Sequence, residues 1–279
     1  MCPGADLDSR PSRVLTPAMS HQTLELHRDG AVARIALARP PANALDLTMA
    51  RELADVALAC DEDPEIRVVV LTGKGKAFCA GGDLGSFAAA GDRAPALLKE
   101  ITAGLHVAIA RFARMRPLLI GAVNGVAAGA GLSLVTACDL AIAAQSARFT
   151  MAYTRAGLVP DGSSTFFLPR LIGLRRTQEL MITNRLLDAS EALSWGLLTR
   201  VVPDDELERA TGELAREIAS GPTGSFGAVK RLLLLSGGDR LESQMEAETR
   251  EIADAARRHD GREGIAAFLE KRPPRFNGH

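Results

Sequence analysis

Two stretches rich in glycine and alanine follow short apolar runs and could present backbone amides to one point. They span residues 67–84 and 117–134. In each, an apolar run typical of a buried strand gives way to small residues that predict a loop opening into a helix. The first N–H groups of a helix have no partner within it, so such junctions suit an anion or a polarised carbonyl oxygen.

Close packing alone would explain the small residues of either stretch. Two strand-to-helix junctions of the same kind favour a shared site instead. If both ends face one point, their N–H groups form an oxyanion hole, in which negative charge on a substrate oxygen is stabilised.

The residues of these junctions resemble the enoyl-CoA hydratase/isomerase (crotonase) family. The similar segments are Ala77–Leu84, Ala122–Gly131, Ala137–Leu140, Gly157–Pro160 and Phe268–Arg272. The resemblance covers nearly the whole chain from about residue 24 onward. It implies an α/β fold, a crotonase-like spiral of repeated ββα units with a C-terminal helical appendage, and an acyl-CoA thioester as the substrate.

Site residues follow from the same resemblance. The two oxyanion-hole donors fall on the N–H groups of Gly82 and Ala130, and Ala80 falls among the substrate-binding residues. In the family, the segment matching Phe268 and Lys271 helps to hold the CoA of a neighbouring subunit. These two residues are therefore expected to bind substrate across a subunit boundary.

The chain departs from family members that hydrate double bonds. Those enzymes place two glutamates in the pocket, and the matching positions here are Ser133 and Tyr153. Since a helix returns to nearly the same face after three residues, Ser133 is expected to look into the pocket from the helix that begins near Ala130. Neither a hydroxyl nor a phenol of pKa about 10 is a good base at neutral pH, so both are expected to bind substrate and not to carry protons.

Asp161 is the remaining candidate for an acid/base group. Without context, Pro160-Asp161-Gly162 is typical of a turn in which the aspartate caps the next helix. Some family members that shift double bonds carry a lone carboxylate at this position. One carboxylate can remove a proton and return it two carbons away, whereas hydration normally asks for both a base and an acid. The sequence therefore favours an enoyl-CoA double-bond isomerase.

Other functions stay open to different degrees. An enoyl-CoA hydratase is the first alternative, and a catalytically inactive CoA-binding protein is the second, because both usual glutamates are absent. A serine thioesterase built on Ser133 is weakly indicated, because the second glycine of a G-x-S-x-G elbow is missing. Dinucleotide binding fails, since the third glycine of its fingerprint is also missing after Gly131.

Composition narrows the class of protein further. A net charge of -1 gives no reason to expect nucleic acid or an anionic membrane as a partner, and 47% hydrophobic residues can fill a large core. The four cysteines and five histidines form no CxxC, HxxxH or HExxH pattern, so we expect no metal and no cofactor apart from the CoA of the substrate. No apolar stretch free of charge reaches a membrane-spanning length, which predicts a soluble, cytoplasmic protein.

Three regions are expected along the chain. Residues 1–18 predict a disordered tail, residues 19–200 the spiral core with the thioester site, and residues 201–279 a helical region. The helical region shows amphipathic patterns over residues 206–220, 226–235, 241–258 and 261–269. In the family such helices pack across subunit boundaries, so a homotrimer or hexamer is expected.

Overall fold

A β-hairpin is the first element of the described structure. The computed structural model describes residues 21–279, so the tail expected over residues 1–18 lies outside it. Strands β1 (Leu24–Asp29) and β2 (Val32–Leu37) pair in antiparallel register, with Asp29 opposite Val32. Gly30 adopts a φ of 56° in the turn, a conformation that glycine adopts without a steric penalty.

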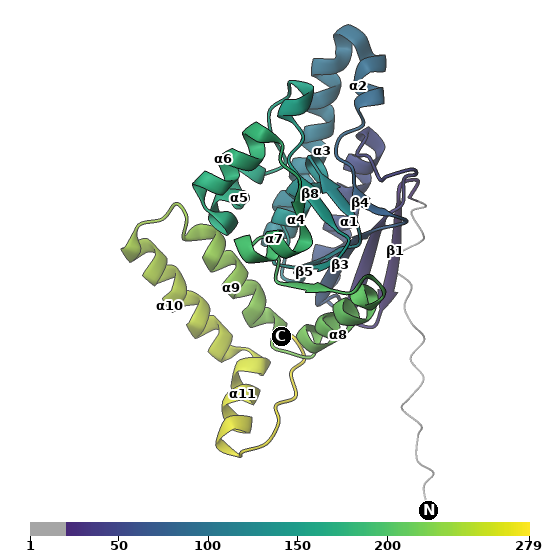
Figure 1. The fold of residues 1–279 in the computed structure, drawn as a ribbon. Helices are drawn as coiled ribbons and strands as arrows, with labels where there is room; N and C mark the ends of the chain where they lie inside the picture. The colour runs from purple at the N-terminus through teal and green to yellow at the C-terminus, as the bar shows by residue number, and fades with distance from the viewer. Residues whose placement is uncertain (1–20) are drawn as a thin grey trace, which may run out of the picture.

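Two sheets form the body of the molecule (Figure 1). The larger has the order β1-β2-β3-β5-β7-β10 and is parallel apart from the first hairpin. Its remaining strands are β3 (Val68–Gly73), β5 (Leu118–Val123), β7 (Leu140–Ala144) and β10 (Arg200–Val202). The smaller has the order β4-β6-β8-β9, formed by β4 (Ala77–Cys79), β6 (Val126–Ala128), β8 (Arg148–Thr150) and β9 (Leu187–Asp188).

The chain alternates between the two sheets. Strands β3, β5 and β7 of the larger sheet are each followed by a short strand of the smaller sheet, namely β4, β6 and β8, and then by helix. This alternation repeats the ββα unit that the family resemblance implied. As a consequence, the ends of β4 and β6, which pair in parallel, bring the two glycine-rich junctions side by side.

Helices cover the sheets and connect the strands. They are α1 (Leu47–Glu62), α2 (Leu84–Ala90), α3 (Ala94–Arg114), α4 (Ala130–Thr136), α5 (Ser164–Ile172), α6 (Leu174–Thr183) and α7 (Ala189–Trp195), with short 3-10 turns at Gly91–Arg93, Thr154–Ala156 and Asp204–Glu206. Helices α1 and α3 pack closely, because a methyl group at Gly104 would lie 3.0 Å from backbone atoms of Ala50. Phe78, Phe112 and Phe149 are fully buried in the core between these layers.

The C-terminal region differs from the expected boundary at residue 200. Strand β10 continues the larger sheet beyond that point. The next helix, α8 (Leu207–Ala219), buries Ala215 against Val68 and Ile120 of the sheet and so belongs to the core. Of the three helices that follow, α9 (Thr223–Leu235) also packs on the core, because a methyl group at its Gly227 would lie 2.7 Å from the carbonyl oxygen of Arg116. Helices α10 (Leu241–Arg257) and α11 (His259–Leu269) lie beyond α9, farther from the sheets in Figure 1. The appendage is therefore shorter than the sequence suggested.

Within residues 21–279, none of the helices combines the length and the apolar composition that crossing a membrane requires.

Candidate active site

A cavity of about 280 Å³ lies where the two glycine-rich junctions meet the helices α2 and α3. Backbone atoms of the junctions and mostly apolar side chains form its wall: Leu45, Ala80, Gly81, Gly82, Leu84, Phe87, Leu98, Ile101, Thr102, Leu105, Gly129, Ala130, Ala152, Tyr153, Ala156, Leu158, Val159 and Asp161. Among these lining residues, Asp161 alone carries a carboxyl group. Of the residues named in the sequence analysis, this cavity brings together Ala80, Gly82, Ala130, Tyr153 and Asp161.

The amide of Gly82 faces away from its neighbouring strand segment. Leu45 donates its N–H to the carbonyl of Gly81 at 2.7 Å and accepts from the N–H of Asp83 at 2.9 Å, which forms an isolated parallel bridge. In such a bridge, the residue between the two bonded neighbours points its own N–H to the opposite side. Gly82 therefore directs its N–H away from Leu45, and Gly82 is one of the residues that line the cavity.

The amide of Ala130 is free for a different reason. Ala130 is the first residue of α4, and Gly129 before it has a φ of 51° and provides no side-chain cap. The first N–H groups of a helix have no acceptor in the helix itself. Within residues 21–279, no backbone carbonyl accepts a hydrogen bond from the N–H of Gly82 or Ala130.

Close packing fixes the spacing of the two junctions. A methyl group added at Gly131 would lie 2.3 Å from the carbonyl oxygen of Cys79, and one added at Gly125 would lie 2.1 Å from that of Lys76. Both distances are far below a van der Waals contact. Close packing, the simpler explanation of the small residues, is thus correct for Gly131 and Gly125, whereas Gly82 and Ala130 line the cavity.

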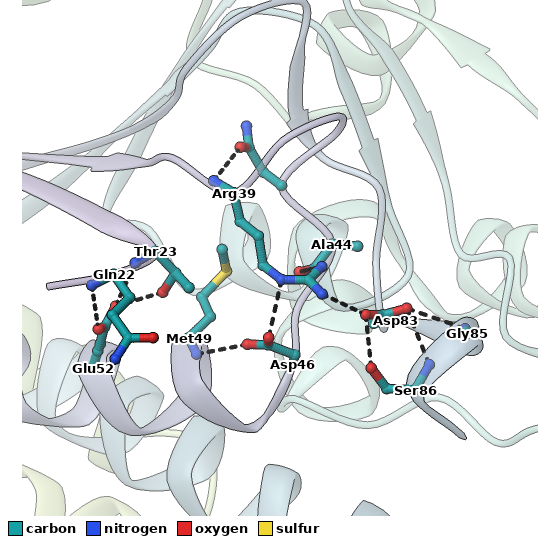
Figure 2. A network of polar contacts seen from close by, with 11 residues as sticks. Gln22, Thr23, Arg39, Ala44, Asp46, Met49, Glu52, Asp83, Gly85 and Ser86 are labelled. Atoms are coloured by element: carbon teal, nitrogen blue, oxygen red, sulfur yellow. Dashed lines mark hydrogen bonds and ion pairs between the residues drawn. The ribbon is translucent and has the colours of Figure 1, made fainter. Parts of the chain in front are cut away.

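Arg39 holds the first junction in place through two carboxylates, as Figure 2 shows. Its Nη2 lies 2.6 Å from Oδ2 of Asp83, and its Nε lies 2.9 Å from Oδ2 of Asp46. Asp46 caps α1 by accepting from the N–H of Met49, and Asp83 caps α2 by accepting from the N–H groups of its second and third following residues. Hydrogen bonds from Ser86 and the charge of Arg39 lower the pKa of Asp83. One guanidinium thus ties the starts of two helices together beside Gly82.

Asp161 presents its carboxyl group to the cavity and does not cap the following helix. Its backbone carbonyl accepts from Ser133 Oγ and from Ser164 Oγ, each at 2.9 Å. Helix α5 begins at Ser164 without a side-chain cap. The carboxyl Oδ1 accepts instead from the hydroxyl of Tyr153 at 2.5 Å. The interpretation in which the Asp161 side chain caps the next helix is therefore wrong, and the carboxyl group stays available for acid/base chemistry.

Tyr153 donates a hydrogen bond and does not act as a base. Burial, together with the negative charge of Asp161, raises the pKa of the Tyr153 phenol above its ordinary range. The neutral phenol can therefore donate to Asp161 across the physiological pH range. Its ring also lines the cavity, in agreement with a contact to substrate.

Ser133 lies elsewhere than expected. It is fully buried and is not part of the cavity wall. Its Oγ donates to the backbone carbonyl of Asp161 and lies 3.3 Å from the Tyr153 hydroxyl. Ser133 therefore lies behind the cavity wall and holds the segment that carries Asp161, and its contact with substrate stays a prediction.

His106 is a residue of this site that the sequence analysis missed. Its Nε2 lies 3.6 Å from Oδ2 of Asp161 and accepts the N–H of Gly162 at 3.2 Å. His106 follows Leu105 and lies one turn after Thr102, both of which line the cavity from α3. In the sequence, the helical spacing of His106 from these residues was the available sign that it faces the cavity. The contact between α3 and Gly162 was needed to place His106 beside Asp161.

Phe268 and Lys271 lie outside the cavity. Phe268 is 83% exposed at the end of α11, and Lys271 follows in the exposed segment after that helix. Their expected contact with the CoA of a neighbouring subunit stays a prediction in a single chain.

Cysteine and metal chemistry gain no support at this site. Burial raises the pKa of the Cys79 thiol to about 11, so its reactive thiolate form is disfavoured. In the described part of the chain, no three His, Cys, Asp or Glu side chains gather in a way that could hold a metal ion.

Comparisons with known proteins agree with this arrangement. The enoyl-CoA hydratase/isomerase family model matches residues 27–279. A probable enoyl-CoA hydratase of Rhodobacter capsulatus is 41% identical over 261 residues, 93% of this chain and 100% of the relative. The 1,2-epoxyphenylacetyl-CoA isomerase of Escherichia coli is 37% identical over 260 residues, 90% of this chain and 97% of the relative.

A solved structure gives the same result for the fold. The putative enoyl-CoA hydratase of Streptomyces coelicolor A3(2) superposes with a TM-score of 0.89 at 30% identity, covering 100% of both chains. The two-sheet arrangement with its C-terminal helices is thus the crotonase fold, as the sequence predicted.

Proposed function

Because the chain belongs to the enoyl-CoA hydratase/isomerase family, we propose that it is an enoyl-CoA double-bond isomerase in which Asp161 moves the proton. The observation that carries this proposal is the single carboxyl group in the cavity wall, held by Tyr153 through a 2.5 Å hydrogen bond. Membership of the family supports an acyl-CoA thioester as the substrate class. One relative is named a hydratase and the other an isomerase, and both names refer to CoA compounds.

The amides of Gly82 and Ala130 would form the oxyanion hole. Both residues line the cavity that Asp161 also lines, and neither amide donates to a backbone carbonyl among the described residues. A thioester oxygen bound there becomes more negative as the enolate forms, and each donor contributes about 3 kcal/mol to the transition state. This stabilisation makes the proton on the neighbouring carbon acidic enough to be removed.

The reaction then needs one proton carrier. Asp161 takes a proton from C2 of a 3-enoyl-CoA, and the electron pair of the broken C–H bond moves toward the thioester oxygen as a dienolate. Asp161 returns the proton to C4, the double bond moves from C3–C4 to C2–C3, and the thioester carbonyl forms again. The carboxylate is regenerated, and no other reactant is consumed.

Hydration is the second candidate, and one observation favours it. His106 lies 3.6 Å from Asp161 and could supply the second proton-carrying group that addition of water asks for. The similarity to the probable hydratase of Rhodobacter capsulatus points the same way.

The test measures both reactions side by side in the wild type and in Asp161→Asn. The wild type should convert a 3-enoyl-CoA to the 2-enoyl-CoA faster than it hydrates crotonyl-CoA. Asp161→Asn should lower isomerisation by about 10²- to 10⁴-fold, as expected for loss of an acid/base group. Hydration that survives the substitution, with no isomerisation in the wild type, would overturn the assignment. CoA binding without either reaction would instead support an inactive CoA-binding protein.

The oligomer is part of the same proposal. We expect a homotrimer or hexamer, because the exposed Phe268 and Lys271 have no part in the cavity of their own chain. Sedimentation measurements on the full chain would determine the subunit number.

A further inference from the structure

The two oxygens of the Asp161 carboxyl group have different neighbours. Oδ1 accepts the Tyr153 hydroxyl at 2.5 Å, which fixes that side of the group. Oδ2 faces Nε2 of His106 at 3.6 Å, slightly beyond hydrogen-bond distance. One oxygen is therefore held firmly, and the other has an imidazole as its nearest titratable neighbour.

The hydrogen bond from Gly162 shows which form of His106 is present. Nε2 accepts the N–H of Gly162 at 3.2 Å, so Nε2 carries a lone pair that faces Gly162, and the ring proton is on Nδ1. This lone pair can receive a proton from Oδ2 of Asp161 when the ring turns it from the N–H of Gly162 toward the carboxyl group, 3.6 Å away.

The titratable neighbours of the Asp161 carboxyl group differ in their exposure to solvent. The Tyr153 hydroxyl is held between Asp161 and Ser133, and Ser133 is fully buried. By contrast, the side chain of His106 is 52% exposed, against 27% for Asp161 itself. Of the two titratable side chains, Tyr153 and His106, that face the carboxyl group, His106 is thus the one suited to exchange protons with solvent.

We propose that His106 is a proton relay that exchanges the proton of Asp161 with solvent. When Asp161 has taken a proton from substrate, the Oδ2–H bond breaks and an Nε2–H bond forms, which leaves a carboxylate beside an imidazolium. The exposed imidazolium ring then turns, gives its Nε2 proton to water and takes another proton from water at Nε2. Nε2 returns this solvent proton to Oδ2 of Asp161 while Nδ1 keeps its own proton, so no oxidant or other reactant is needed.

This relay rests on the proposed function but makes a separate demand on the site. Moving a double bond requires only that Asp161 take and return one proton. Exchange of that proton with water requires a path out of the cavity. The two processes should therefore respond differently to loss of the imidazole.

The variant that separates them is His106→Gln. The carbonyl of a glutamine amide can reach the position of Nε2 and accept the N–H of Gly162, yet the amide does not bind a proton at neutral pH. The segment that carries Asp161 thus keeps its support while the relay is lost. His27→Gln, at an exposed histidine of β1, is the matched control.

Two rates are measured in deuterated water for each protein. The first is isomerisation of a 3-enoyl-CoA, and the second is deuterium incorporation at the α-carbon of butyryl-CoA, which has no double bond to move. His106→Gln should slow deuterium incorporation at least about tenfold more than it slows isomerisation, because only the first needs the relay. Added imidazole should restore the incorporation rate, and His27→Gln should behave as the wild type.

Several results would overturn the relay. Equal deuterium incorporation in the wild type and His106→Gln would show that water reaches Asp161 directly. A fall of both rates in the same proportion, without rescue by imidazole, would give His106 a structural role. No incorporation by the wild type would also contradict the relay. The proposed function fails separately, if the wild type incorporates deuterium through His106 but does not isomerise 3-enoyl-CoA.

Discussion

The candidate site has two halves that are built in different ways. The backbone half consists of the junctions that carry Gly82 and Ala130, and it is fixed by contacts that leave no room for an added methyl group at Gly131. The side-chain half consists of Asp161, Tyr153 and His106, which come from separate segments and meet through hydrogen bonds and near contacts. In the proposed function, the backbone half would bind the thioester carbonyl and the side-chain half would move the proton, so the two tasks can be broken one at a time.

Breaking the backbone half should have the largest effect. Gly131→Ala places a methyl group 2.3 Å from the Cys79 carbonyl, an overlap with backbone that cannot move away easily. We expect a loss of about 3 kcal/mol in the free energy of unfolding, measured by urea denaturation. Gly238→Ala is the control, because nothing lies within 4 Å of the added methyl group, and it should change stability by less than about 0.5 kcal/mol. Equal stability of the two variants would refute the close-packing argument.

Breaking the side-chain half should lower the rate of isomerisation. Tyr153→Phe removes the hydroxyl that holds Oδ1 of Asp161, so the carboxyl group can turn away from substrate. A hydrogen bond to a charged group contributes about 1.5–3 kcal/mol, so kcat for isomerisation should fall about tenfold or more with little change in KM. An unchanged kcat would mean that Tyr153 does not orient Asp161.

The smallest expected effect concerns the Tyr153 phenol, which should not ionise in the folded protein at the pH where a free phenol does. The chain contains a single tyrosine, so ultraviolet absorbance of phenolate reports on Tyr153 alone. Burial and the charge of Asp161 raise its pKa, which means that the folded protein keeps the phenolic proton where an unfolded chain has lost it. The stability that comes from the neutral phenol is therefore complete below the unfolded pKa of about 10 and is lost as the pH rises further.

Titration of folded and urea-unfolded protein checks this directly. The unfolded protein should form phenolate near pH 10, and the folded protein should form none until it unfolds. Phenolate that forms near pH 10 in the folded protein would place Tyr153 in contact with solvent and away from Asp161.

The backbone half was the part that could be predicted from sequence. Small residues after a buried strand let two backbone segments come close, and this information is local in residues 67–84 and 117–134. The family resemblance then assigned the donor role to Gly82 and Ala130 within them. The side-chain half could be predicted only in part. Asp161 was identified, but the direction of its carboxyl depends on Tyr153 and Ser133, and Ser133 was expected to face the cavity.

Contacts between distant segments explain what was missed. His106 meets Gly162 across 56 residues, and nothing in either local segment indicates that contact. The same reason applies to α8, whose amphipathic pattern was clear while its partner was not. Its small residues pack on Val68 and Ile120 because β10 continues the sheet, and no local pattern over residues 207–219 contains this information.

The central claim is that one thioester oxygen binds the amides of Gly82 and Ala130 while Asp161 alone performs the proton transfer. The most direct measurement is the infrared carbonyl stretch of an isotope-labelled acyl-CoA thioester bound to wild type and to Asp161→Asn. Two strong donors should shift the stretch to lower frequency by the same amount in both proteins, although only the wild type isomerises substrate. A bound thioester whose stretch stays at its value in water, or a shift that disappears with Asp161→Asn, would contradict the account.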